Sequence, residues 1–263
     1  MRILVVGEGK SGTTALMQSL RAAVPEAAES FEPTHLGDVP RSGPLVAKKL
    51  LAAWSPDEAP LLSNFDHVIY IVRDPRDRLI SHLLYDSYNR GAKLTDSQSE
   101  RWLTALSRKV ANPLNQPLIR LMDIWWQMTD ADLMQGYIRT LWRTSLFRRR
   151  YRDDVTMFRY EDLVADRFDD LNNALGLELA RANVDGPEER VLRSGSDGDW
   201  RHWFTPIDVN AFRPSTTKWL RRHGYAHRDW ELADPPQIHA EQTTEYVDRL
   251  LTGVRASAAT LND

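Results

Sequence analysis

The chain has 263 residues, of which 42% are hydrophobic, and a formal net charge of −3. This length and composition allow a large buried core, and the charge excludes a protein that binds nucleic acid over a generally basic surface. The sequence contains no cysteine, which excludes disulfides, thiolate metal sites and a cysteine nucleophile. It starts with strand-like residues and has no apolar run long enough to span a bilayer, so we expect a cytoplasmic protein.

Residues 3–16, ILVVGEGKSGTTAL, combine a strand, a glycine-rich turn and the start of a helix. The unbroken apolar run Ile3–Val6 is typical of a strand buried on both faces of a parallel sheet. Helical spacing begins at Thr13 and stops at Pro25. The N–H groups of a helix start, together with Lys10, favour a bound phosphate or sulfate. The predicted anion-binding residues are Lys10, Ser11, Gly12, Thr13 and Thr14.

The spacing of this loop differs from that of the nucleotide triphosphatase loop. The pattern GxxxxGK[ST] would require a glycine at position 4, which is Leu4. Only Gly7 and Glu8 separate the strand from Gly9, which is too little chain for the usual wrap around a triphosphate. From this stretch alone, a simple turn with an incidental lysine also stays open.

A second strand enters a helix at His67–Arg73, HVIYIVR, followed by a helical pattern from Pro75 towards Gly91. Further strands are expected at Pro44–Leu51 and Val155–Phe158. Two such strand–helix units predict an α/β fold of three layers, with a central, mainly parallel sheet flanked by helices, similar to P-loop nucleotide triphosphatases. Ligands bind at the carboxyl ends of such strands, so Arg73 and the glycine-rich loop can share one ligand.

The rest of the chain is expected to be largely helical, within a single domain of residues 1–263. Residues 192–206 are polar and rich in glycine but contain two tryptophans and a phenylalanine, which indicates an ordered functional loop rather than a linker. The last dozen residues are expected to fray. Helices are predicted at 95–128, with breaks at Pro113 and Pro117, and at 133–151, 159–176 and 237–251.

Four stretches together resemble the sulfotransferases that use 3′-phosphoadenosine-5′-phosphosulfate (PAPS). GKSGTT resembles the family's PKSGTT loop, which binds the 5′-phosphosulfate, with Gly9 in place of the proline. IYIVRDPRDRLISH resembles the strand and helix that bind the 3′-phosphate, with Arg73 and Ser81 eight positions apart. FRYEDL resembles the YEDL element, and RSGSDGDWRHWFT resembles the late RKGxxGDWKNxFT loop that covers the nucleotide. Their order and separation also agree, over residues 1–225.

The resemblance implies transfer of a sulfuryl group from PAPS to a hydroxyl of a small-molecule or carbohydrate acceptor, with 3′,5′-ADP as product and no metal. The acceptor could be a sugar, a lipid or another alcohol, and the oligomeric state stays open. Such a reaction is an in-line displacement that needs positioning and charge stabilisation. Besides the loop residues, the implied nucleotide-binding residues are Arg73, Ser81, Tyr160, Arg193, Gly195 and Trp200.

The proton acceptor is assigned from the branches of this family. The cytosolic branch has a histidine after the strand that reads LVAKKLL here, and this sequence has none there. The carbohydrate branch has an EP element whose glutamate is proposed as base, and FEPTHL resembles it. Glu32 is therefore the first candidate, His35 the second and His82 the third. The alternative is that Glu32 only forms an ion pair with Lys48 or Lys10.

Two departures from the family pattern affect the nucleotide site. Ala15 stands where many relatives have a tryptophan that stacks on adenine, so Trp200 or Phe204 would have to take that role. Ser194 replaces the family's lysine, which removes one phosphate contact. Two other functions stay open: a P-loop kinase or nucleotide triphosphatase, which would need a metal-binding acid where Arg73 stands, and a non-catalytic nucleotide-binding scaffold.

Overall fold

The computed structural model describes residues 1–184 and 186–260, and the chain forms two compact units. The first unit comprises Met1–Asp74 and Trp142–Leu192, and the second comprises Pro75–Leu141 and Arg193–Asp263. Helix α5 (Leu133–Arg150) contributes residues to both. The expectation of one domain over residues 1–263 stays a prediction.

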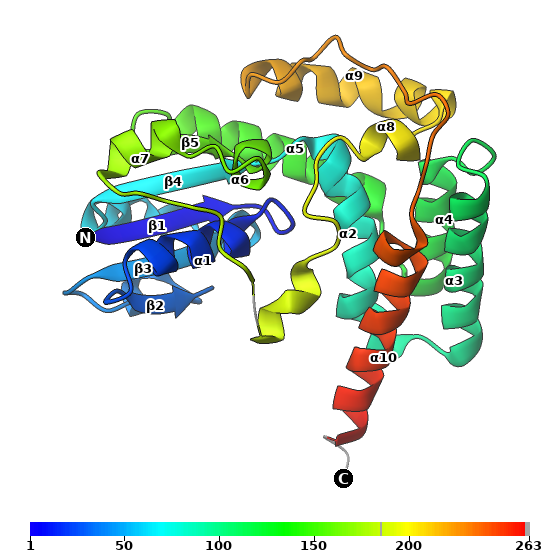
Figure 1. The fold of residues 1–263 in the computed structure, drawn as a ribbon, viewed down its shortest axis with the longest axis horizontal. Helices are drawn as coiled ribbons and strands as arrows, with labels where there is room; N and C mark the ends of the chain where they lie inside the picture. Colours follow the sequence, from blue (N-terminus) through cyan, green and yellow to red (C-terminus); the bar gives the residue numbers. More distant parts are fainter. Residues whose placement is uncertain (185, 261–263) are drawn as a thin grey trace. The chain divides into compact units, whose positions relative to one another are not determined.

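The first unit is built on a five-stranded sheet in the order β2-β3-β1-β4-β5. All neighbouring strands pair in parallel, and Figure 1 shows β1 and β4 side by side in this sheet. A parallel sheet flanked by helices confirms the predicted α/β fold. The strands are β1 (Arg2–Gly7), β2 (Ala28–Phe31), β3 (Leu45–Leu50), β4 (His67–Val72) and β5 (Thr156–Arg159).

Apolar side chains cover both faces of the sheet in this unit. On one face, Leu16 and Leu20 of α1 (Thr13–Ala23) are fully buried and join a cluster with Phe158 and Phe168, whose rings stack at 5.5 Å. A second group of rings joins Tyr70 of β4 to the C-terminal half of α5, with 5.2 Å between the ring centres of Tyr70 and Phe147. Residues 3–6 of β1 are therefore inaccessible to solvent, as their unbroken apolar run predicts.

The first unit differs from the sequence predictions at two places. A single helix was expected from residue 159 to 176, but the chain forms α6 (Tyr160–Val164) and α7 (Asp169–Leu175). Asp166 between them has φ of 54°, a left-handed conformation that ends the first helix. The edge strand Ala28–Phe31, which pairs with β3, has no counterpart among the predicted strands. Its four residues are mostly exposed, so no apolar run marks it.

The second unit is helical. The breaks predicted at Pro113 and Pro117 are present, and Trp102 and Trp125 pack 4.9 Å apart in its interior. The sequence did not predict α9, which has 17 residues, and α10 begins later and extends further than expected. Of the tail expected to fray, residues 261–263 lie outside the described residues. The helices are α2 (Pro75–Arg90), α3 (Asp96–Ala111), α4 (Leu118–Thr129), α8 (Trp200–Trp203), α9 (Pro206–Arg222) and α10 (Thr244–Thr260), with the first part of α5.

No helix within the described parts of the chain has both the length and the apolar character that a bilayer crossing requires.

Lys109 of α3 links three segments of the second unit from a fully buried position. Its ammonium donates to the carbonyl oxygens of Pro113 and Gln116, both at 2.7 Å, and of Trp203. Burial lowers the pKa of Lys109 to about 8, against the opposing effect of Asp208. The lysine is thus a charged group that the fold keeps away from water at neutral pH.

We expect Lys109→Met to lower the free energy of unfolding by about 2–4 kcal/mol, because three carbonyl groups lose their donor. An unfolded lysine keeps its proton up to a pKa near 10.5, so between about pH 8 and that value the unfolded state binds more protons. Wild-type stability should therefore rise with pH over this interval relative to the variant.

Urea denaturation at about pH 7.5 and about pH 9.5 measures both effects, with the exposed Lys93→Met as control. A Lys109→Met variant as stable as the wild type, or a wild-type advantage that shrinks with pH, would contradict this account of Lys109.

Candidate functional site

The loop between β1 and α1 has a conformation that its own residues hold. Lys10 and Gly12 have φ values of 68° and 92°. The Ser11 N–H and hydroxyl both donate to the Glu8 carbonyl oxygen, at 3.1 and 2.7 Å. The Glu8 carboxylate accepts two hydrogen bonds of 2.7 Å from Arg143. The loop is thus a short, anchored turn, and the Ser11 hydroxyl proton is used within it.

Gly12 lies against Tyr160, the first residue of α6. A Cβ atom at position 12 would be 2.5 Å from Cδ2 of Tyr160, closer than real side chains approach. Among the residues described, no side chain caps the N-terminus of α1, and its first turn contains no acidic residue. A helix start of this kind suits an anion, because its first N–H groups have no partner within the helix.

Arg73 follows β4 and reaches the same loop. It is 6% exposed, and its guanidinium donates to the Lys10 carbonyl oxygen at 3.3 Å and lies 4.1 Å above the ring centre of Tyr160. The structure thus brings together three residues predicted from separate motifs, Lys10, Arg73 and Tyr160, beside Gly12. Their predicted contacts with a nucleotide stay predictions.

Lys48 of β3 connects the start of α1 to Glu32. Its ammonium lies 2.6 Å from Oε1 of Glu32 and 2.9 Å from the hydroxyl of Thr14, and 3.7 Å from the ring centre of Phe31. Lys48 is 2% exposed, whereas the Glu32 side chain is 39% exposed. Of the two partners considered for Glu32, the structure shows an ion pair with Lys48. The signal available in the sequence was a lysine pair inside an otherwise apolar strand.

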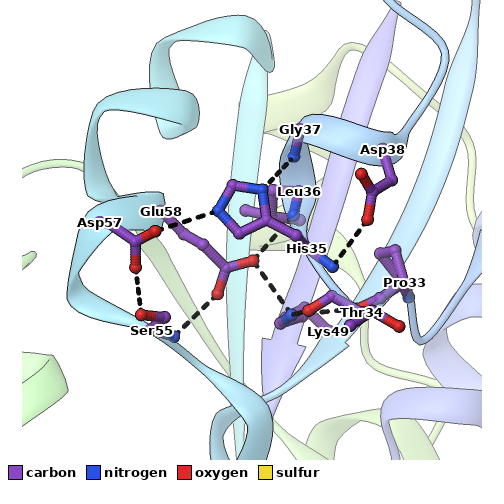
Figure 2. A network of polar contacts seen from close by, with 10 residues as sticks. All are labelled: Pro33, Thr34, His35, Leu36, Gly37, Asp38, Lys49, Ser55, Asp57 and Glu58. Carbon is purple, nitrogen blue, oxygen red and sulfur yellow. Dashed lines mark hydrogen bonds and ion pairs between the residues drawn. The ribbon is translucent and has the colours of Figure 1, made fainter.

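His35 has both ring nitrogens engaged. Nδ1 accepts a hydrogen bond of 3.0 Å from the Gly37 N–H, which requires that Nδ1 carry no proton. In the neutral ring the proton is then on Nε2, which lies 3.3 Å from the Asp57 carboxylate (Figure 2). This arrangement caps a short 3₁₀ helix, η1 (Leu36–Asp38), and disfavours His35 as the base. The third candidate, His82, lies on α2 of the second unit.

The late loop of the second unit is organised by two carboxylates. Asp77 of α2 accepts hydrogen bonds from the N–H groups of Gly198 and Trp200, at 2.7 and 2.8 Å. Asp199 accepts from Arg193, from the Ser194 hydroxyl at 3.3 Å and from the Ser196 hydroxyl at 3.2 Å. Residues 193–200 are therefore an ordered loop, as predicted. Asp77 was missed, although an acid in the first turn of a helix was visible in DPRD.

Three other predicted residues of the second unit, Ser81, Trp200 and Phe204, are buried. Ser81 of α2 is 3% exposed. Trp200 is 2% exposed, with the guanidinium carbons of Arg76 and Arg201 at 3.7 and 4.5 Å from its ring centre. Phe204 is 1% exposed. The geometry therefore disfavours the prediction that either ring stacks on adenine, while the assignments of Ser81, Arg193, Gly195 and Trp200 to the nucleotide stay predictions.

Metal ligands were also sought among the described residues. Within 1–184 and 186–260, no three His, Asp or Glu side chains lie together in a way that could hold a metal ion.

Comparison with known proteins identifies the fold. No protein-family model matches the sequence, and no curated protein matches it. Among solved structures, the chain is similar to mouse sulfotransferase SULT7A1 complexed with PAP, the product of PAPS, with a TM-score of 0.52 and 16% identity over 83% of this chain and 84% of that chain. The chain therefore has the fold of PAPS-dependent sulfotransferases, which confirms the resemblance at the level of the fold.

Two structures of retinol dehydratase are more distant. They contain androsterone with the inactive cofactor PAP, and retinol with PAP. Each aligns over 84% of this chain and 80% of the other, with TM-scores of 0.45 and 0.41 and identities of 14% and 13%.

Two glycines of the loop provide a matched test of its geometry. Gly12→Ala should destabilise the protein by about 2 kcal/mol or more, because the new Cβ meets Tyr160 and φ is positive. Gly9→Ala should change stability by less than about 0.5 kcal/mol, since among the described residues, its two chain neighbours apart, no atom lies within 4 Å of its Cβ position. Urea denaturation of both variants measures this difference, and equal losses would show that the approach of Tyr160 does not constrain position 12.

Proposed function

We propose that this protein is a sulfotransferase that moves the sulfuryl group of PAPS to a hydroxyl of a small-molecule or carbohydrate acceptor. The proposal rests on one observation: Lys10, Arg73 and Tyr160 lie together at the start of α1, beyond the carboxyl ends of β1 and β4. In parallel α/β sheets this edge is where ligands bind. The sulfotransferase fold gives independent support.

The residues present suit the two anionic ends of PAPS. Lys10 and the first N–H groups of α1 supply a charge and hydrogen-bond donors for the 5′-phosphosulfate. Arg73 supplies a second cation at the neighbouring strand end, already oriented by Tyr160 and the Lys10 carbonyl, which suits the 3′-phosphate. This requirement for two anion sites distinguishes PAPS from donors that carry phosphate at one end only.

The chemistry assigned to these residues is an in-line displacement. The acceptor oxygen forms a bond to sulfur while the bond from sulfur to the bridging oxygen of the 5′-phosphate breaks. Negative charge builds on that leaving oxygen, where Lys10 stabilises it. Glu32 receives the proton of the acceptor hydroxyl. Lys48 holds Oε1 of Glu32, and the 39% exposure of this side chain leaves the carboxylate within reach of an acceptor.

Backbone strain supports the choice of Lys10 and Glu32. Among the described residues, only Lys10, Glu32, Asp130 and Asp166 have positive φ without being glycine, with 68° at Lys10 and 48° at Glu32. Such conformations cost of order 1 kcal/mol or more and concentrate at functional sites. Lys10 is the residue predicted to stabilise the leaving oxygen, and Glu32 is the predicted base.

Glu32→Gln should lower kcat for sulfuryl transfer by a factor of about 100 to 10,000 with little change in PAP affinity, because glutamine has a similar shape but cannot accept the proton. Lys10→Ala should abolish transfer. Transfer of labelled sulfate from PAPS to panels of sugars, lipids and phenols measures both. Unchanged turnover of Glu32→Gln would contradict its role as base.

The transfer assay, together with measurements of PAP binding and of ATP turnover, separates the other candidate functions. A wild type that binds PAP but sulfates none of the panel would favour a non-catalytic scaffold. Turnover of ATP that depends on Mg²⁺ would favour a kinase or nucleotide triphosphatase.

Arg73→Ala should weaken binding of 3′,5′-ADP far more than binding of 5′-AMP, because only the former carries the 3′-phosphate assigned to Arg73. A charge-assisted contact of this kind contributes about 1.5–3 kcal/mol, or roughly tenfold to over a hundredfold in Kd. Isothermal titration measures both ligands, with the exposed Arg149→Ala as control. Equal losses for both nucleotides would show that Arg73 does not bind the 3′-phosphate.

A further inference from the structure

A buried ion pair, Lys49–Glu58, contacts the segment that follows Glu32. Lys49 of β3 and Glu58 of the 3₁₀ helix η3 (Pro56–Asn64) are both 0% exposed, and the ammonium lies 3.0 Å from Oε1 of Glu58. Figure 2 shows this pair within a network of polar contacts that includes the residues after Glu32. None of the steps assigned above uses either residue.

The pair binds the backbone of three of the four residues that follow Glu32. The Lys49 ammonium donates to the carbonyl oxygens of Pro33 and Thr34, at 3.0 and 2.7 Å. The Glu58 carboxylate accepts from the Leu36 N–H at 2.8 Å through Oε1, and from the Ser55 N–H at 2.8 Å through Oε2. The three protons of the ammonium and both oxygens of the carboxylate thus all have partners.

Lys48, which precedes Lys49 in β3, holds Glu32 from the opposite face of the sheet. The Glu32 N–H donates to the Lys48 carbonyl oxygen at 2.9 Å, and the Lys48 ammonium binds its carboxylate. Adjacent residues of a strand direct their side chains to opposite faces of the sheet. Lys48 therefore holds the side chain of Glu32, while Lys49 holds the peptide groups that follow it.

Stability alone does not account for the buried pair. Taking two charges out of water costs several kcal/mol each, and apolar residues of similar volume are often equally or more stable in such positions. What this pair supplies, and an apolar pair cannot, is a set of directed contacts to Pro33, Thr34 and Leu36. These contacts over-determine the backbone next to Glu32, whose left-handed φ of 48° requires such support.

We propose that Lys49 and Glu58 are positioning residues that hold the strained backbone at Glu32, so that its carboxylate is directed at the acceptor hydroxyl. This inference rests on the proposed function. In this proposal neither residue contacts the nucleotide or the acceptor. Loss of the pair lowers kcat by misplacing the base and leaves the binding of the nucleotide intact.

The test replaces the pair by apolar residues in the double variant Lys49→Met/Glu58→Leu. We expect a folded protein with wild-type affinity for PAP and with kcat lowered roughly 10- to 100-fold, as expected for a misplaced catalytic group. Asp57→Asn is the matched control: Asp57 belongs to the same network and contacts His35 and Ser55, but none of residues 33–34 and 36. It should retain wild-type kcat. If the double variant does not fold, Lys49→Met/Glu58→Gln also removes both charges together, keeps the shape of the side chain at position 58 and carries the same expectation.

The decisive readout repeats these substitutions in the Glu32→Gln background. If the pair acts through Glu32, removing it should lower kcat no further once the base is gone. An equal loss in both backgrounds would mean a merely structural role and would overturn the proposal. So would a double variant with full kcat and normal stability. A wild type without transfer activity would overturn the proposed function itself, and with it this inference.

Discussion

Two adjacent lysines at the carboxyl end of β3 are the constraint on which the site region of the first unit depends. Both are almost completely buried in a strand that is otherwise apolar, and a buried ammonium group must find partners. Because strand side chains alternate, the partners of Lys48 and Lys49 lie on opposite sides of the sheet. Lys48 ties Thr14 of α1 to Glu32, and Lys49 ties Glu58 to the peptide groups after Glu32.

This arrangement couples the two sides of the proposed reaction. The loop that would hold the leaving group begins α1, and the residue that would receive the proton follows β2, so no local contact along the chain sets the distance between them. The Lys48 ammonium, within 2.9 Å of Thr14 and 2.6 Å of Glu32, sets it instead. An in-line displacement requires the acceptor oxygen, the sulfur and the leaving oxygen on one line, with the base within reach of the acceptor hydroxyl. A single buried side chain that contacts both elements fixes the distance between the leaving-group loop and the base.

Sequence reasoning recovered the parts of the fold and site that carry local signals. Unbroken apolar runs identified β1 and β4, and the glycine pattern identified the loop that Gly12 and Tyr160 close. The elements it missed lack such signals: β2 is short and exposed, and α9 contains prolines at its first position and in its interior. The break between α6 and α7 depends on the left-handed turn at Asp166, which no periodicity reveals.

The site residues also divide into those that a local sequence pattern identified and those that it did not. Lys10, Arg73 and Tyr160 were found because each belongs to a stretch with a recognisable pattern. Asp77, Lys49 and Glu58 were not, since their roles arise from partners in other elements. Asp77 binds residues more than a hundred positions away, and Lys49 and Glu58 bind the segment between β2 and β3. His35 shows the converse. Its residue type suggested a base, whereas its contacts with Gly37 and Asp57 make it a cap. Residue type alone therefore overestimates reactivity where the surrounding backbone has unpaired donors to satisfy.

The edge of the sheet at β1 and β4 is the proposed binding site for a nucleotide with two separate anionic ends. Isothermal titration of the wild type with PAP and with ATP, each with and without Mg²⁺, tests it most directly. We expect PAP to bind more tightly than ATP, with an affinity that Mg²⁺ does not change. Tight binding of ATP that requires Mg²⁺, with weak binding of PAP, would contradict it.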